Sequence, residues 1–283
     1  MMTINSICVC GAGTMGSGIA QAAAQSGFHT ILYELNESVL EKAKKSIQQN
    51  LASLVAKGKI TTDWMQGVMG RIRFTNDLQD CLADIIIEAI VEKPELKIAL
   101  FNQLAELNHS EVIFASNTSS LSVSRIAEGI QRPERVIGMH FFNPATIMKL
   151  VEVVYTPLTN SHTTDTVVAL TKAMGKVPVL CSDAPGFIVN RVARPFYIES
   201  LRLAEEGKTE MEQIDRLMES TGFKLGPFRL MDLIGNDVNY AVSCSVYDQL
   251  DSPERLKPSF IQEQKVKEGK LGKKTGEGYY RYS

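Results

Sequence analysis

Short apolar runs alternate with longer amphipathic stretches over the N-terminal part of the chain. Apolar runs rich in β-branched residues predict buried strands, and apolar residues at helical spacing predict helices between them. We expect helices at 17–26, 37–57 and 61–69 and from Pro94 onward, and strands at 7–10, 30–33, 84–88, 112–115, 136–139, 150–154 and 177–180. This alternation predicts an α/β fold with a Rossmann-type doubly wound sheet.

The pattern changes at Pro185 and Gly186, where strand-like runs give way to helical ones. We expect further helices at 188–205, 211–220, 238–248 and 258–268. A length of 283 residues suits two domains, since a typical domain has about 100–200 residues. The sequence therefore predicts a Rossmann-like domain at 1–185, followed by an all-helical C-terminal domain at 186–283. Such a helical domain often covers the cofactor cleft and supplies a dimer interface.

The first predicted strand runs directly into a turn with the spacing Gly-x-Gly-x-x-Gly. Its residues are Gly11, Ala12, Gly13, Thr14, Met15 and Gly16. The first glycine allows a tight turn, the second lets a diphosphate approach the backbone, and the third lets the next helix pack closely on the sheet. The N-terminus of that helix offers N–H groups to an anion. We therefore expect this turn to bind a dinucleotide; the alternative is a purely structural turn.

The second predicted strand ends at Glu34, roughly 20 residues after the glycine-rich turn, which is where dinucleotide-binding domains carry an acidic residue. A carboxylate there can accept hydrogen bonds from an adenosine ribose and would repel a 2′-phosphate. The sequence thus predicts NAD rather than NADP as the cofactor of residues 1–185. The alternative is that Glu34 only caps the following helix.

Composition and charge exclude several classes of protein. Hydrophobic residues make up 44% of the chain, charged residues 22%, and the net charge is −2, so no basic field attracts nucleic acid or an anionic membrane. No apolar run approaches the roughly 20 residues that span a bilayer, and the N-terminus lacks a signal-peptide pattern, so we expect a cytoplasmic location. Five cysteines form no Cys-x-x-Cys pair, so we expect reduced thiols and no metal site.

Polar clusters at 116–120, 140–144 and 185–191 follow predicted strands or the domain junction, and ligands of an open α/β sheet bind beyond the carboxyl ends of its strands. His140 suits general acid–base chemistry, because an imidazole with an ordinary pKa of about 6.5 accepts and returns protons near neutral pH. Glu152 lies among valines inside the next strand, where an unpaired carboxylate is costly, so we expect it to pair with His140. The alternative for His140 is a structural hydrogen bond.

With these residues in place, the chain resembles the short-chain L-3-hydroxyacyl-CoA dehydrogenases, particularly their bacterial 3-hydroxybutyryl-CoA members. The resemblance covers essentially the whole chain through residues 11–16, 116–121, 138–144, 183–191 and 271–280. It implies an oxidoreductase of fatty acid metabolism that oxidises (S)-3-hydroxyacyl-CoA to 3-oxoacyl-CoA with NAD and catalyses the reverse reduction. His140 would be the general acid and base, oriented by Glu152. A homodimer formed through the helical domain is also implied.

The resemblance implies further site residues. Ser119 and Asn190 match residues that position the substrate, and Ser119 is also assigned to the cofactor site. Cofactor-contacting positions are matched by Glu92, Lys97, Asn143 and Lys274, with Asn117 a candidate for the nicotinamide side. Asn50 and Lys57 match coenzyme A contacts and, being seven residues apart, share a helix face. The chain departs from the family pattern at Asn50, where the compared member has Ser, and at Glu34, where Asp is more usual.

Two other interpretations are open. Residues 232–239 resemble the 3-hydroxyadipyl-CoA dehydrogenases of aromatic breakdown, which would imply a dicarboxylic acyl group. A non-catalytic dinucleotide-binding protein, such as the dehydrogenase-like lens crystallins, is the second, and Ser119, His140, Glu152 and Asn190 argue against it because a pure binder has no use for a base. An acyl-CoA is therefore the expected partner, with neither nucleic acid nor membrane.

Overall fold

The structure, a computed structural model, describes residues 3–282 and divides the chain into two units, Met1–Asp183 and Ala184–Ser283. The boundary falls two residues before the one expected from the sequence, within the segment where strand-like runs give way to helical ones.

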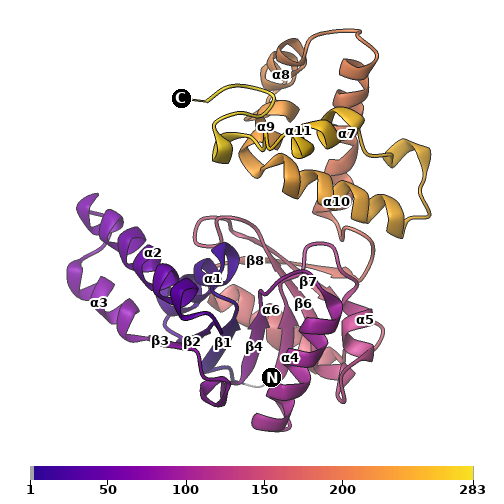
Figure 1. Ribbon diagram of the computed structural model, residues 1–283. Helices are drawn as coiled ribbons and strands as arrows, with labels where there is room; N and C mark the ends of the chain where they lie inside the picture. Colours follow the sequence, from indigo (N-terminus) through magenta and orange to yellow (C-terminus); the bar gives the residue numbers. More distant parts are fainter. Residues whose placement is uncertain (1–2, 283) are drawn as a thin grey trace. The chain divides into compact units, whose positions relative to one another are not determined.

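One eight-stranded sheet forms the centre of the first unit, with the strand order β3-β2-β1-β4-β5-β6-β7-β8 (Figure 1). All pairs from β3 to β6 are parallel, β7 runs antiparallel to β6, and β8 runs parallel to β7. The order of the first six strands is that of dinucleotide-binding folds, which confirms the predicted Rossmann-type sheet. The strands are β1 (Ser6–Cys10), β2 (His29–Tyr33), β3 (Ile72–Thr75), β4 (Ile85–Glu88), β5 (Ile113–Ser116), β6 (Val136–Phe141), β7 (Leu150–Tyr155) and β8 (Val177–Ser182).

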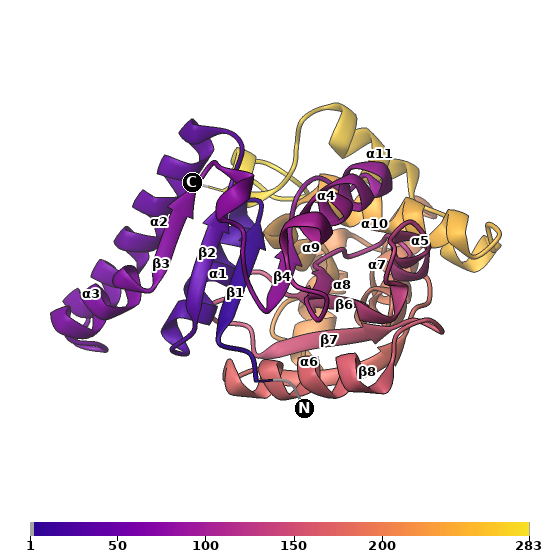
Figure 2. The same ribbon diagram turned by 90° about the horizontal axis from the view of Figure 1, so that it is seen from below.

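Helices cover both faces of the sheet, so the central strands are apolar along their whole length. One face carries α1 (Thr14–Gln25), α2 (Glu37–Ala56), α3 (Thr62–Gly70) and α6 (Ser161–Ala173), which share one hydrophobic core with Ile7 and Val9 of β1. In Figure 2, α6 lies along β7 and β8. The other face carries α4 (Pro94–Leu107) and α5 (Val123–Glu128), and there Phe101 of α4 packs on Phe114 of β5 with ring centroids 5.0 Å apart. Short 3-10 turns are η1 (Leu78–Asp80) and η2 (Pro133–Arg135).

Cys8 and Cys10 lie on one face of β1, as the two-residue spacing predicts. Both are fully buried and their sulfur atoms are 3.9 Å apart, which confirms their predicted place in the core. Hydrogen bonding with Cys8 and Cys81 raises the pKa of the Cys10 thiol, and burial acts in the same direction. All five cysteines are free.

Three elements of the first unit were not expected from the sequence. The strand β3 has four residues with an exposed arginine at its second position, so its apolar pattern is too short to stand out. The helix α5 has six residues, and α6 carries threonines at four of its thirteen positions, which favour strands more than helices. In α6, tertiary contacts decide the outcome, because Val167 and Leu170 belong to the main core.

The second unit contains helices and no strand among its described residues, 184–282, which confirms the predicted all-helical C-terminal domain. Its main core contains Tyr197, Leu201, Phe228 and Met231. The sequence did not predict α9, an eight-residue helix that begins with a proline and ends before a glycine. The helices are α7 (Val189–Glu205), α8 (Met211–Ser220), α9 (Pro227–Ile234), α10 (Asn236–Gln249) and α11 (Phe260–Lys267), with 3-10 turns η3 (Glu254–Leu256) and η4 (Lys273–Thr275).

A buried carboxylate fixes the segment 271–282 onto α9. Asp232 is 1% exposed and accepts hydrogen bonds from the backbone N–H groups of Tyr279 (2.9 Å) and Tyr280 (3.0 Å) and from the hydroxyl of Tyr282 (2.9 Å). A Cβ atom at Gly272 would lie 2.2 Å from the carbonyl oxygen of Asp232, so only glycine permits this approach. The segment is therefore closely packed although it contains only one short helical turn.

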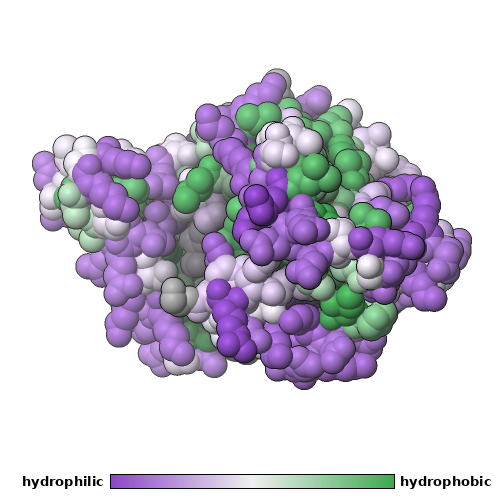
Figure 3. All heavy atoms as spheres, turned by 90° about the horizontal axis from the view of Figure 1, so that it is seen from above, coloured by the Kyte–Doolittle hydropathy of each residue, from purple (hydrophilic) through white to green (hydrophobic). Residues whose placement is uncertain are grey.

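The surface carries both hydrophilic and hydrophobic residues. On the face drawn in Figure 3, hydrophilic residues cover most of the surface and hydrophobic residues gather in separate groups. Exposed large hydrophobic side chains of the second unit include Val192, Leu217, Phe223 and Phe260. Within residues 3–282, we find no helix with the length and apolar character that crossing a membrane requires.

Candidate active site

The glycine-rich turn joins β1 to α1, and each of its three glycines has a different steric environment. Gly11 has φ +101°, and a Cβ there would lie 2.7 Å from the carbonyl oxygen of Ala89. A Cβ at Gly16 would lie 1.8 Å from the carbonyl oxygen of Gly11. The main constraint on Gly16 is therefore this contact within the turn, and not the close packing of the helix on the sheet that the sequence predicted. A Cβ at Gly13 would meet nothing within 4 Å. The turn is thus sterically fixed at both ends and open at its middle.

The open middle lies at the N-terminus of α1, where Gly13 is the N-cap residue and the first turn carries no acidic side chain. Thr14 is exposed and Met15 half-buried. Glu34 lies just beyond β2, and its carboxylate accepts the backbone N–H of Ala12 at 3.0 Å and that of Asn36 at 3.1 Å. The cap of α2 is Asn36, whose side chain accepts the N–H groups of Ser38 and Val39, so Glu34 does not cap this helix itself. It bonds the backbone of the cap residue and lies against the glycine-rich turn.

His140 and Glu152 face each other across β6 and β7. The antiparallel register pairs these two residues directly, and His140 Nδ1 lies 2.7 Å from Glu152 Oε2. The histidine is 6% exposed and the glutamate 0%. Because an ionised carboxylate can only accept, Nδ1 donates the proton of this bond, which gives the lone pair of a neutral ring to Nε2. The Phe142 ring packs against the imidazole with centroids 4.5 Å apart.

The residues after β5 are tied to both neighbouring strands. Asn117 donates its backbone N–H to the Glu88 carbonyl at 2.8 Å, and its side-chain oxygen accepts the N–H of Phe141 at 2.9 Å. This second bond connects the end of β5 to the residue directly after His140. Ser119 follows two residues later, and its backbone N–H donates to Glu92 Oε1 at 3.0 Å. The structure thus brings Asn117, Ser119, Glu92 and His140 to the same edge of the sheet.

Lys97 is held between two carboxylates. Its side chain is 1% exposed, and its Nζ lies 2.6 Å from Glu88 Oε1 and 3.1 Å from Glu92 Oε2. Glu88 also accepts hydrogen bonds from Ser116 Oγ at 2.8 Å and from the N–H of Ile90 at 2.6 Å. Burial raises the pKa of the Glu88 carboxyl, while the Lys97 charge and these hydrogen bonds oppose the rise. Both oxygens of the buried Glu88 carboxylate therefore have hydrogen-bond or ion-pair partners.

The other predicted site residues lie just beyond β6, on α2 and in the second unit. Asn143 is exposed just beyond β6, and Asn50 and Lys57 are exposed on α2 and at its C-cap. Two residues belong to the second unit. Asn190 lies in the first turn of α7, where its carbonyl accepts from Arg194 Nε at 3.0 Å, and Lys274 lies in η4.

Sequence reasoning missed Glu88 and Asp237. Glu88 ends a run of three buried isoleucines, and an acidic residue in that position was the available signal. Asp237 binds the ammonium of Lys274 with both oxygens, at 2.6 and 2.7 Å. No sequence signal connects them, because they lie 37 positions apart. The same segment supplies Asp232, so residues 232–237 serve to hold 271–282.

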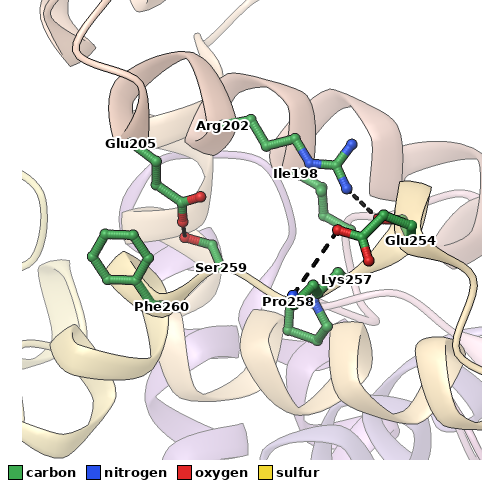
Figure 4. Close-up of a pocket in the computed structure, with 8 residues that line it drawn as sticks. All are labelled: Ile198, Arg202, Glu205, Glu254, Lys257, Pro258, Ser259 and Phe260. Atoms are coloured by element: carbon green, nitrogen blue, oxygen red, sulfur yellow. Dashed lines mark hydrogen bonds and ion pairs between the residues drawn. The ribbon is translucent and has the colours of Figure 1, made fainter.

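Two cavities lie away from these residues. One, of about 350 Å³, belongs to the second unit (Figure 4) and is lined by Ile198, Arg202, Glu205, Glu254, Lys257, Pro258, Ser259 and Phe260. Its polar groups bind one another, since Arg202 donates to the Glu254 carbonyl and Ser259 to Glu205. The other lies by Ser6, Asp84 and His109, near the start of β1 and β4. Within residues 3–282, no group of His, Cys, Asp and Glu is arranged to hold a metal ion.

Comparison with known proteins identifies related families and structures. The family model described as 3-hydroxyacyl-CoA dehydrogenase, NAD binding domain, matches residues 6–184, and the model of the C-terminal domain of 3-hydroxyacyl-CoA dehydrogenase matches residues 186–282. The two models meet where the structure divides the chain.

Relatives match over nearly the whole chain. A 3-hydroxyadipyl-CoA dehydrogenase of Escherichia coli is 44% identical over 99% of this chain, which spans 59% of that protein's length. A probable 3-hydroxybutyryl-CoA dehydrogenase of Deinococcus radiodurans is 41% identical over 97% of this chain and 99% of its own. The solved structure of (S)-3-hydroxybutyryl-CoA dehydrogenase from Ralstonia eutropha has a TM-score of 0.94 at 36% identity, covering 99% of this chain and all of that one.

The two glycines of the turn offer a matched test of this geometry. We expect Gly16→Ala to lower the midpoint of thermal unfolding of the first unit by several degrees, because a Cβ there collides with the Gly11 carbonyl and costs about 1–3 kcal/mol. Gly13→Ala should change the midpoint little, since its Cβ has open space. Calorimetry measures both, and equal shifts for the two variants would contradict the assignment.

Proposed function

The chain belongs to the 3-hydroxyacyl-CoA dehydrogenase family, with NAD as its cofactor, and on this premise we propose that it interconverts (S)-3-hydroxybutyryl-CoA and acetoacetyl-CoA. The observation that carries the proposal is the buried His140–Glu152 pair beside the loop that presents Ser119. The oxidation removes a hydroxyl proton and a hydride from one carbon. NAD⁺, when bound, supplies the hydride acceptor, so the protein must supply a base and hold the substrate.

In this proposal His140 is the base. Its Nδ1 is committed to Glu152, so Nε2 takes the hydroxyl proton as the carbon loses its hydride and returns it in the reverse direction. Glu152 keeps the ring in the required tautomer and stabilises the imidazolium that forms. Ser119 and Asn190 match the family's substrate-positioning residues, and we propose that they hold the reacting oxygen and the thioester carbonyl.

The first unit fits a dinucleotide. The space over Gly13 and the N-terminus of α1 suit a diphosphate, and the Glu34 carboxylate beside the turn suits an adenosine ribose. The remaining family positions complete the proposed set. For the cofactor these are Glu92, Lys97, Asn117, Asn143 and Lys274, and for coenzyme A they are Asn50 and Lys57.

A second candidate substrate is a dicarboxylic acyl-CoA. It rests on the 44% identity to the 3-hydroxyadipyl-CoA dehydrogenase of Escherichia coli and on residues 232–239. Much of that segment holds residues 271–282 in place, since Asp232 and Asp237 bind Tyr279 and Lys274. The segment is therefore weaker support for a particular acyl group than its sequence suggests, and we favour the four-carbon substrate.

Two further expectations stay predictions. One is a homodimer formed through the second unit, whose exposed Val192, Leu217 and Phe223 offer apolar surface for it. The other is a cytoplasmic location.

A direct spectrophotometric assay tests the reaction and its substrate together. We expect purified protein to oxidise NADH in the presence of acetoacetyl-CoA, with a higher kcat/KM than for 3-oxoadipyl-CoA. The absorbance of NADH follows the reaction. A preference for the dicarboxylic substrate would favour the second candidate, and no turnover with either would support a non-catalytic dinucleotide-binding protein.

Replacement of the base should abolish most turnover and leave cofactor binding intact. We expect His140→Ala to lower kcat by about 10²–10⁴-fold, because proton transfer then falls to water, with little change in the Kd of NAD⁺. Rapid-mixing kinetics and calorimetry measure the two quantities. His162→Ala, on the exposed side of α6, is the matched control. Turnover unchanged in His140→Ala would remove this residue from the mechanism.

Loss of the Glu34 carboxylate should reduce the preference for NAD over NADP. We expect Glu34→Ala to weaken NAD⁺ binding by about tenfold, since hydrogen bonds to a charged group are lost, and to weaken NADP⁺ binding less because repulsion of the 2′-phosphate is lost too. Calorimetric titration gives both Kd values. Glu37→Ala, an exposed change in the first turn of α2, is the control. Equal weakening of both cofactors would show that Glu34 does not recognise the ribose.

A further inference from the structure

Three charged side chains, Glu88, Lys97 and Glu92, form a continuous charge network at the end of β4. Glu88 is fully buried and Lys97 is 1% exposed, while the side chain of Glu92 is 40% exposed. The Lys97 ammonium bridges the two carboxylates at 2.6 and 3.1 Å. The charge network thus leads from the core to the surface edge where the predicted site residues lie. It carries two negative charges and one positive charge.

Stability alone is a poor reason for this arrangement. Removing charges from water is expensive, and replacing a buried ion pair by uncharged residues of similar size is often neutral or stabilising. Breaking such a pair by removing one partner is costly, because the other charge is then left uncompensated. A purely structural pair should therefore be replaceable as a pair without loss of function.

Glu92, at the outer end of this charge network, holds a loop. Glu92 Oε1 accepts the backbone N–H of Ser119 at 3.0 Å and the hydroxyl of Thr118 at 3.1 Å. The Thr118 oxygen in turn accepts the N–H of Leu121 at 2.9 Å and that of Ser120 at 3.3 Å. The backbone of residues 118–121 is therefore fixed through one carboxylate, and Lys97 fixes that carboxylate.

We propose that Glu88 and Lys97 are positioning residues for Ser119, acting through Glu92 on the loop 117–121. Glu88 holds the Lys97 ammonium, Lys97 holds Glu92, and Glu92 holds the loop backbone. Ser116 supports the inner end, since its hydroxyl donates to Glu88 Oε2 at 2.8 Å. The inference deepens the proposed function and rests on it in one respect, the role of Ser119 in holding substrate.

The decisive variant is the double substitution Lys97→Met/Glu88→Gln. Each single substitution should lower the unfolding midpoint, because Lys97→Met leaves the buried Glu88 carboxylate without a cation, and Glu88→Gln leaves the buried Lys97 ammonium with only the partly exposed Glu92 as its partner. The double variant should regain the wild-type midpoint, since both charges are gone and the amide introduced by Glu88→Gln can keep hydrogen bonds to Ser116 and Ile90. Its kcat/KM for acetoacetyl-CoA should still be about 10- to 100-fold below wild type, because a small misplacement of a positioning group costs that much.

A second readout does not depend on turnover. Amide hydrogen exchange of the peptide covering 117–121 should be about tenfold faster in the double variant, because Glu92 no longer has its anchor. The matched control is Arg135→Met/Glu111→Gln, an ion pair of the same unit at the start of β6, opposite the end that carries His140. This control should leave both the exchange of 117–121 and kcat/KM unchanged.

Recovery of kcat/KM together with the midpoint in the double variant would overturn the proposal, because the pair would then be structural only.

If the double variant does not fold, the single variant Glu92→Gln tests the proposal. It changes a partly exposed residue, and we expect faster exchange of 117–121 and a lower kcat/KM at an unaltered midpoint, whereas unchanged exchange and kcat/KM would overturn the proposal. If wild type itself shows no turnover, the proposed function fails, and the exchange of 117–121 alone then supports or overturns the positioning role.

Discussion

Parallel pairing of β1 with β2 and β4, of β4 with β5, and of β5 with β6 brings the carboxyl ends of five strands to one edge of the sheet. The predicted chemistry of the first unit depends on this constraint. Hydrogen bonds connect neighbouring turns at this edge. The Asn117 side chain bonded to the Phe141 backbone is one such link, and Glu34 bonded to Ala12 is another.

Carboxylates in both units, the buried Asp232 and the partly exposed Glu92, hold backbone segments that have little regular structure. Asp232 takes three donors from the last residues that the structure describes, and Glu92 takes donors from the loop after β5. In both cases a carboxylate replaces the hydrogen bonds that a strand or helix would otherwise provide. The fold can therefore present irregular loops with defined geometry, which binding sites require.

The sequence predicted the parts of the site that depend on local spacing. The glycine-rich turn, the strand ending at Glu34 and the costly carboxylate of Glu152 were all recognisable from neighbouring residues. The contact of Lys97 with Glu88 and Glu92 was not, because it depends on how α4 packs over the sheet. The assignment of Lys97, Asn190 and Lys274 to the proposed site rests on the family resemblance alone. Likewise β3 and α6 owe their form to tertiary packing, which overrides their weak local patterns.

Direct pairing of His140 with Glu152 has a consequence for how this protein tolerates change. Side chains alternate along a strand, so a slip of β7 by a single position would turn the carboxylate to the opposite face and set a valine, Val151 or Val153, against the imidazole. The connection 142–149 fixes that register. Insertions or deletions there are consequently constrained even though Ile147, within it, is 72% exposed, and a surface loop that looks permissive is a poor place to graft new sequence.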